Sequence, residues 1–143
     1  MFMSDRSKRM VRLVFVLALI TAVLVGCGAR KNRDELLKKF VERALTERYL
    51  TNDYESYLNE VDYGVELDTV QQQMVIAMHK QFADYQEKKH GTVAYVRMTD
   101  VVKEENDSAC FVHYIVVYSD STEESAVMKV VEENGEWKIK SRN

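Results

Sequence analysis

The sequence predicts an α+β protein in which the helices come first and the strands follow. Apolar residues recur at helical spacing through residues 34–89, and they alternate with polar residues at strand spacing through residues 92–141. Separate runs of helices and strands are typical of α+β proteins, whereas α/β proteins alternate the two. A chain of 143 residues is long enough for one such domain. We therefore expect N-terminal helices packed on a curved four-stranded antiparallel sheet.

Residues 1–26 have the pattern of a secretory signal peptide. Basic residues precede Leu13, and the segment Leu13–Val25 is apolar except for Thr21. A charged start, an apolar middle and a small residue at the cut define such signals. The apolar segment is shorter than the roughly 20 residues that a membrane-spanning helix needs. The pattern therefore favours a cleaved signal over an uncleaved membrane anchor.

The motif LVGC at residues 24–27 resembles the lipobox of bacterial lipoproteins. In that family the signal is cut before the cysteine, the thiol receives a diacylglycerol, and the new amine is usually acylated. The resemblance implies cleavage between Gly26 and Cys27, lipidation of Cys27, and a short tether over residues 27–33. Two or three acyl chains hold a protein firmly at a membrane. The resemblance also implies that Gly28, in place of an aspartate, favours the outer membrane of a bacterial cell envelope. The basic segment over residues 29–33 lacks the acidic stretch of surface-exported lipoproteins, which favours a domain facing the periplasm.

Three helices are expected before residue 91. Asn32, Asn52 and Asp68 each stand three residues before Glu or Gln, which is the capping pattern at a helix start. The longest helix follows Asp68 and ends with cations and Gly91, as helix C-termini prefer. Apolar residues at helical spacing form one face of the first helix, namely Leu37, Phe40, Val41, Ala44, Leu45 and Tyr49. The corresponding stripe of the longest helix includes Val70, Met74, Ala77, Met78 and Tyr85, widened by Val75, Ile76 and Phe82.

Four strands are expected after residue 91. The run over residues 109–118 is apolar on both faces, which suits a central strand covered on both sides. Asn134-Gly135 predicts a tight hairpin, because both residues tolerate positive φ. The connections are short, so neighbouring strands are expected to run antiparallel.

Helices followed by a curved antiparallel sheet resemble the cystatin-like, NTF2-like α+β cone over residues 34–141. The chain also resembles small bacterial lipoproteins of the DUF4878 type, which combine a lipobox with a closing stretch like that over residues 134–139, NGEWKI. The absence of proline departs from that group, whose members often carry one before the first helix. The resemblance implies the domain over residues 34–143, and it brings little function with it.

Charge argues against a nucleic-acid-binding protein. The first 26 residues hold four of the 20 bases and one of the 23 acids, so residues 27–143 hold 16 bases and 22 acids. An acidic domain repels phosphate backbones. Common nucleotide, metalloprotease and hydrolase motifs are missing from the sequence, so no cofactor is expected.

The histidines and Cys110 are most simply explained as structural residues. His79, His90 and His113 lie 11 and 23 residues apart, which gives no local pairing for a metal site. We therefore expect no metal. Cys110 lies in an apolar run without basic neighbours, which predicts a small buried side chain rather than a reactive thiol.

One weak catalytic candidate remains. Some NTF2-like enzymes place an acid and a tyrosine inside the cone, where low dielectric raises a carboxyl pKa. Asp100 has the same strand parity as Met98 and could point inward, with Tyr95, His113 and Tyr114 as pocket companions. The competing interpretation is that Asp100 reaches water near the strand end or marks a bulge.

Three functional hypotheses follow. The first is a lipid-anchored envelope protein whose non-catalytic domain binds a small apolar ligand or a protein partner. The second is an enzyme with an acid–tyrosine site. The third is a structural accessory lipoprotein that forms a homodimer through its exposed sheet face.

Overall fold

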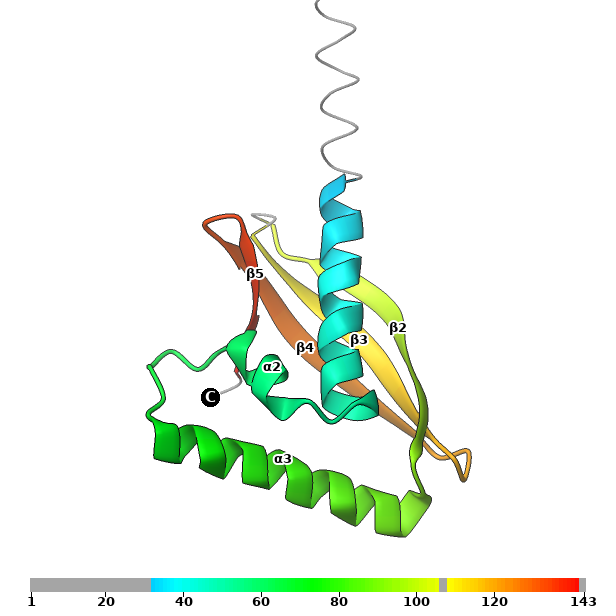
Figure 1. Cartoon of the computed structure of the whole chain (residues 1–143). Helices are drawn as coiled ribbons and strands as arrows, with labels where there is room; N and C mark the ends of the chain where they lie inside the picture. The colour runs from blue at the N-terminus through cyan, green and yellow to red at the C-terminus, as the bar shows by residue number, and fades with distance from the viewer. Residues whose placement is uncertain (1–31, 106–107, 142–143) are drawn as a thin grey trace, which may run out of the picture. The chain divides into compact units, whose positions relative to one another are not determined.

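The structure is a computed structural model that describes residues 32–105 and 108–141 (Figure 1). The chain divides into two compact units, Met1–Lys39 and Phe40–Asn143. The second unit contains the sheet together with η1, α2 and α3. It is therefore the unit that positions the candidate site.

The predicted signal peptide and the predicted lipidation site at Cys27 lie outside the described residues. Helical structure begins at residue 32, is α-helical through residue 45, and continues as the π-helical segment η1 (Thr46–Leu50). Across the described ranges, no helix is long and apolar enough to span a membrane.

The sheet has five strands and is mixed, which corrects the prediction of four antiparallel strands (Figure 1). In chain order the strands are β1 (Val61–Asp62), β2 (Val93–Lys103), β3 (Ala109–Tyr118), β4 (Glu123–Glu133) and β5 (Glu136–Lys140). Their spatial order is β1-β5-β4-β3-β2. The meander from β2 to β5 is antiparallel as predicted, whereas β1 pairs with β5 in parallel. A strand of two residues has no alternation to detect, and Val61 fits the end of a helix equally well.

Two further helices precede the long strands. The short helix α2 (Tyr54–Asn59) is capped by Asp53, whose carboxylate accepts from the Ser56 amide, rather than by the expected Asn52. The longest helix, α3 (Thr69–His90), begins at the predicted capping box, in which Asp68 and Gln71 bond reciprocally. It ends at Gly91, whose φ of 84° favours glycine. A Cβ at Gly91 would overlap the Ser119 hydroxyl oxygen, so a larger residue here would also require the Ser119 side chain to rotate.

The core lies on one face of the sheet, which we call the inner face. It carries Val112, Tyr114 and Val116 of β3 together with Met128 and Val130 of β4, all at most 5% exposed. The helical residues Val41, Ala44 and Leu45 are equally buried. The outer face carries the alternate residues of β3, because side chains alternate along a strand.

Helix α3 contributes nothing to this core, because none of its residues is buried. Three members of its predicted stripe, Val70, Met74 and Met78, are 69%, 61% and 68% exposed. In Figure 1, α3 extends along the lower end of the unit and connects through its C-terminus to β2. Polar contacts fix that end: Gln86 donates to Glu124, and His90 Nδ1 lies 2.9 Å from an Asp120 oxygen.

Candidate functional site

A cavity of about 500 Å³ lies between α3 and the inner side of the sheet. We call it the large cavity. Helix α3 lines it with Val75, Met78, His79 and Phe82, and the remaining lining residues are Arg48, Tyr57, Val61, Tyr63, Tyr114, Val127, Met128, Lys129, Ile139, Lys140 and Ser141. The cavity exists because α3 is held away from the core rather than packed into it. Its volume falls within the range of small-molecule sites, roughly 300–1,000 Å³.

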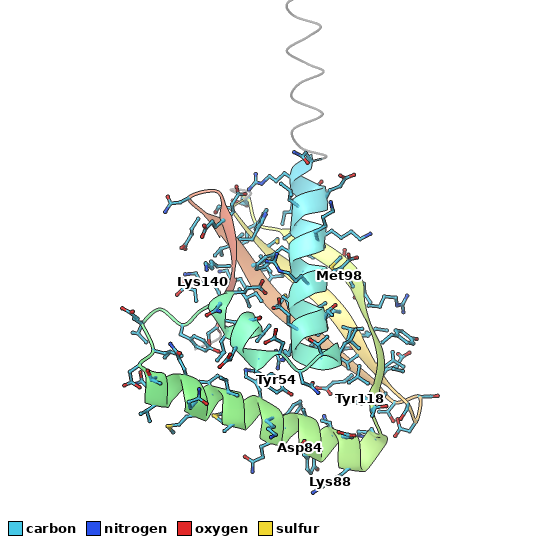
Figure 2. All side chains as sticks on the ribbon, in the orientation of Figure 1. Tyr54, Asp84, Lys88, Met98, Tyr118 and Lys140 are labelled. Atoms are coloured by element: carbon cyan, nitrogen blue, oxygen red, sulfur yellow. The ribbon has the colours of Figure 1, made fainter. Side chains whose placement is uncertain are left out.

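A second space of about 210 Å³, the small cavity, lies on the other side of the same residues. It shares Arg48, His79 and Phe82 with the large cavity. Tyr54 and Tyr118, which Figure 2 labels between α3 and the rest of the unit, also line it. Arg48 and His79 therefore stand where the two cavities meet.

Arg48 is the central charge of the site. The π-helical segment η1 presents it beside two aromatic rings, with its guanidinium carbon 4.9 Å from the Tyr49 ring centre and 5.4 Å from that of Tyr57. Its Nη1 donates to the Tyr57 hydroxyl over 3.2 Å. A guanidinium stays protonated in proteins, so Arg48 brings a permanent positive charge.

Arg48 lacks a carboxylate partner within the described part of the chain. The two lysines of the cavity wall differ in this respect, and the strand register places both of them on the outer face. Lys129 lies 3.5 Å from Glu104, and Lys140 pairs with Asp62 and Glu133. No residue that lines the large cavity is an Asp or a Glu. Arg48 therefore makes the described lining of this cavity positive, although the chain as a whole carries −3.

Three phenols surround this charge. The Tyr49 and Tyr114 hydroxyl oxygens lie 3.0 Å apart, and their rings are in tilted contact. Burial raises the pKa values of Tyr49 and Tyr57 above the ordinary range. Both phenols therefore stay protonated at neutral pH and remain potential hydrogen-bond donors.

His79 connects α3 to this group through its ring. It stacks on Tyr54 with ring centres 5.8 Å apart and meets the edge of Tyr57 at 5.7 Å. Burial, and secondarily the charge of Arg48, lowers the pKa of His79 to about 4. The imidazole is therefore neutral at pH 7, with one nitrogen that donates and one that accepts. The sequence predicted a satisfied structural histidine; the described residues give His79 ring contacts but no hydrogen bond, and its position at both cavities was not predicted.

A pair of acids lies beside the site without lining either cavity. Arg43 Nη2 lies 2.6 Å from Glu60 Oε1, and its Nε lies 3.9 Å from Glu47 Oε1. The second carboxyl oxygens of Glu47 and Glu60 are buried and receive no donor from described groups. Burial, together with hydrogen bonding to and repulsion by Glu60, raises the pKa of Glu47 to about 7. Below pH 7 the carboxyl group of Glu47 is therefore mostly protonated.

The four pocket residues proposed from the sequence do not come together. Tyr114 is 3% exposed on the inner face and lines the large cavity. Tyr95, Asp100 and His113 lie on the outer face. In the strand register Tyr95 lies opposite Val117, and His113 lies between Asp100 of β2 and Val127 of β4. A register shift between Met98 and Asp100 reverses the side-chain parity of β2 at that point. Asp100 is exposed and accepts a hydrogen bond from the Val101 amide, so the bulge interpretation describes its position.

The sequence contained one indication that Arg48 belongs to a site, although it was not among the predicted site residues. Arg48 follows Ala44 by four positions and Val41 by seven, so it lies on the apolar face of its helix. A charge in that stripe indicates either a buried ion pair or a site. Tyr57 and His79 gave no such signal, because aromatic residues at helical spacing usually belong to a core.

The structure offers no group of three His, Cys, Asp or Glu side chains that could hold a metal within residues 32–105 and 108–141. Cys110 is buried in β3, as the sequence predicted.

Comparison with known proteins identifies the fold. No protein-family model matches the chain, and no curated protein does. One similar solved structure is that of a Campylobacter jejuni protein described as an NTF2-like transpeptidase. The two share a TM-score of 0.57 and 11% identity over 73% of this chain and 97% of that chain. At this identity the likeness shows the fold alone, so the domain has an NTF2-like fold.

Proposed function

We propose that this chain is a non-catalytic ligand-binding protein that is anchored by lipid in a bacterial cell envelope. The observation that carries the ligand-binding part is the large cavity between α3 and the sheet. Its lining combines apolar side chains, among them Val75, Met78 and Phe82, with a few polar groups around Arg48. Small-molecule sites commonly combine an apolar lining with a few placed polar groups.

The absence of acids from the large cavity supports binding over acid–base catalysis there. The acid–tyrosine hypothesis relied on Asp100, which is exposed on the outer face, away from Tyr114. The homodimer hypothesis has a separate basis, since the outer face leaves Tyr95 and Val102 at 49% and 46% exposure. A melting temperature that rises with protein concentration would favour it.

Native mass spectrometry of the full chain, purified in detergent from a bacterial host, tests ligand binding. The expected result is an excess mass that is lost on collisional activation. Val75→Trp should abolish this excess mass, because the larger ring fills the cavity that Val75 lines. Met74→Trp is the matched control, since Met74 precedes Val75 on the same helix but its side chain is 61% exposed and lines neither cavity. A bare mass for the wild type, or equal retention by both variants, would contradict the proposal.

The lipid anchor is proposed from the lipobox resemblance at residues 24–27 and from the similarity to DUF4878-type lipoproteins. Cys27→Ser should leave the precursor uncut and prevent lipid attachment, because the acceptor thiol is gone. Mass spectrometry of the membrane fraction, with metabolic labelling by palmitate, measures both changes. A Cys27→Ser protein that is processed and membrane-bound like the wild type would rule out lipidation at this residue.

A further inference from the structure

We infer that the ligand of the large cavity is an amphipathic carboxylate whose head group binds Arg48. The inference rests on the proposed ligand-binding function and specifies the chemistry of that site. It follows from a count of hydrogen-bond donors and acceptors around Arg48, from the charge of the cavity lining, and from the apolar surface of α3.

The group around Arg48 has more donors than acceptors. A guanidinium has five N–H groups, and the structure gives Arg48 one acceptor, the Tyr57 hydroxyl. Tyr57 accepts that bond, and its own O–H has no acceptor among the described residues. Of the Tyr49 and Tyr114 hydroxyls, one donates to the other, so the O–H of the accepting hydroxyl is also without an acceptor among the described residues. His79 adds an N–H that makes no hydrogen bond within the described part of the chain.

These donors line the cavities, and none of them is among the buried side-chain atoms without a partner in the described residues, so water can reach them. A ligand that displaces this water must supply acceptors in its place, because a donor that loses water without a new partner is costly. A charge that is partly removed from water is stabilised only when it is paired and hydrogen-bonded. The lysines at the large cavity have protein carboxylates as partners, and Arg48 has none. An oxyanion from outside the chain would supply both the missing charge and the missing acceptors.

A carboxylate fits this site better than a phosphate. A single unpaired guanidinium carries one positive charge, which one carboxylate balances. A phosphate monoester carries close to two negative charges at neutral pH, and one of them would remain uncompensated. Carboxylate oxygens also accept two parallel bonds from the planar guanidinium fork.

The rest of the ligand is expected to be apolar. Val75, Met78 and Phe82 of α3 face Met128 and Ile139 of the sheet across the large cavity. Burial of apolar ligand surface against these side chains contributes roughly 25 cal/mol per Å². A head group at Arg48 therefore places an aliphatic or aromatic body between α3 and the sheet.

Isothermal titration of the full chain with two probes of nearly equal shape tests the inference. The probes are 4-phenylbutanoate and the uncharged 4-phenylbutan-1-ol. We expect the carboxylate to bind wild-type protein about tenfold or more tightly than the alcohol, since a charge-assisted bond is stronger than a neutral one. This comparison needs no variant, so it stays informative even if substitution of Arg48 disturbs folding.

The variants then assign the effect to Arg48. Arg48→Met should remove the preference for the carboxylate and leave alcohol binding nearly unchanged, and Arg48→Lys should keep part of the preference. Lys129→Met is the control, because Lys129 belongs to the cavity wall but its ammonium lies over the Phe111 ring on the outer face, 3.5 Å from Glu104. It should keep the preference. Circular dichroism and melting curves of each variant establish that it is folded.

The possible failures are distinguishable. Equal binding of both probes to wild-type protein would overturn the carboxylate inference and leave ligand binding in place. A preference that survives in Arg48→Met, or disappears in Lys129→Met, would overturn the assignment to Arg48. Absence of binding by either probe, together with a bare native mass, would contradict the proposed function and the inference with it.

Discussion

Strand β3 and helix α3 are both rich in apolar residues, yet the structure uses them in opposite ways. Eight of the ten β3 residues are among the buried ones, including Val112 and Val116 at 0% and 1% exposure. None of the 22 residues of α3 is buried. A strand with hydrogen-bonded neighbours on both sides is fixed in place, and its side chains complete a core. A helix that is held by polar contacts at its end and by His79 near its middle leaves a space beneath it.

The comparison suggests a division between stability and binding. Burial of apolar surface is the main favourable contribution to folding, and in this unit it is concentrated on the sheet and on residues 40–45. Helix α3 contributes fewer such contacts and supplies much of the cavity wall. Elements with few buried contacts are those that open locally at low free energy. Ligand entry by displacement of α3 would therefore leave the sheet intact.

The largest expected effect comes from truncating each element in turn. Val112→Ala in β3 should lower the free energy of unfolding by about 2 kcal/mol, because it removes two methyl groups from an inner-face side chain that is 0% exposed. Met74→Ala in α3 should change it by less than about 0.5 kcal/mol, as is usual for exposed positions. Urea denaturation of both variants measures the difference. Similar losses in the two variants would mean that α3 belongs to the cooperative core.

A second prediction concerns Glu47, which lies on the helix that covers the sheet. Its pKa is about 7 in the folded chain against 4.5 as the ordinary value. Between these values the folded state holds a proton that the unfolded state has released, so stability falls as pH rises from 4.5 to 7. Glu47→Gln removes this loss and should stabilise the protein at pH 8 by on the order of 1–3 kcal/mol. Near pH 4 the variant and the wild type should differ little.

Denaturation at pH 8 and at pH 4.5 checks the sign of this effect. Glu42→Gln is a suitable control, since Glu42 lies on the same helix and is exposed. If the difference in stability between the wild type and Glu47→Gln is the same at both pH values, the folded state does not raise the pKa of Glu47.

The sequence predicted the elements that depend on local patterns. The capping box at Asp68 and the hairpin at Asn134-Gly135 were confirmed, the latter with φ values of 53° and 78°. Both are encoded by residues a few positions apart. The meander was predicted for the same reason, because its strands are joined by short turns.

The features that were missed depend on contacts between distant segments. The parallel pairing of Val61 with Ile139 joins residues far apart in the chain, and nothing in a two-residue strand predicts it. The bulge before Asp100 changes the face of every later residue of β2, so parity alone placed Asp100 on the wrong side. The site around Arg48 combines η1, α2, α3 and β3, which no local pattern brings together.

The smallest effect is expected at His79, which joins α3 to the rest of the unit. Its pKa is about 4 in the folded chain against 6.5 ordinarily, so the unfolded state binds the extra proton between these values. Stability therefore falls as pH drops from 6.5 to 4, which is opposite in sign to the effect of Glu47. Because the two effects oppose each other over pH 4.5–6.5, the variant is best made in the Glu47→Gln background. There, His79→Phe should retain the ring contacts and flatten the remaining pH dependence, as denaturation at pH 4.5 and 6.5 would show. An unchanged slope would mean that His79 is open to water, and that α3 is held to the unit through its C-terminal contacts at Gln86 and His90 alone.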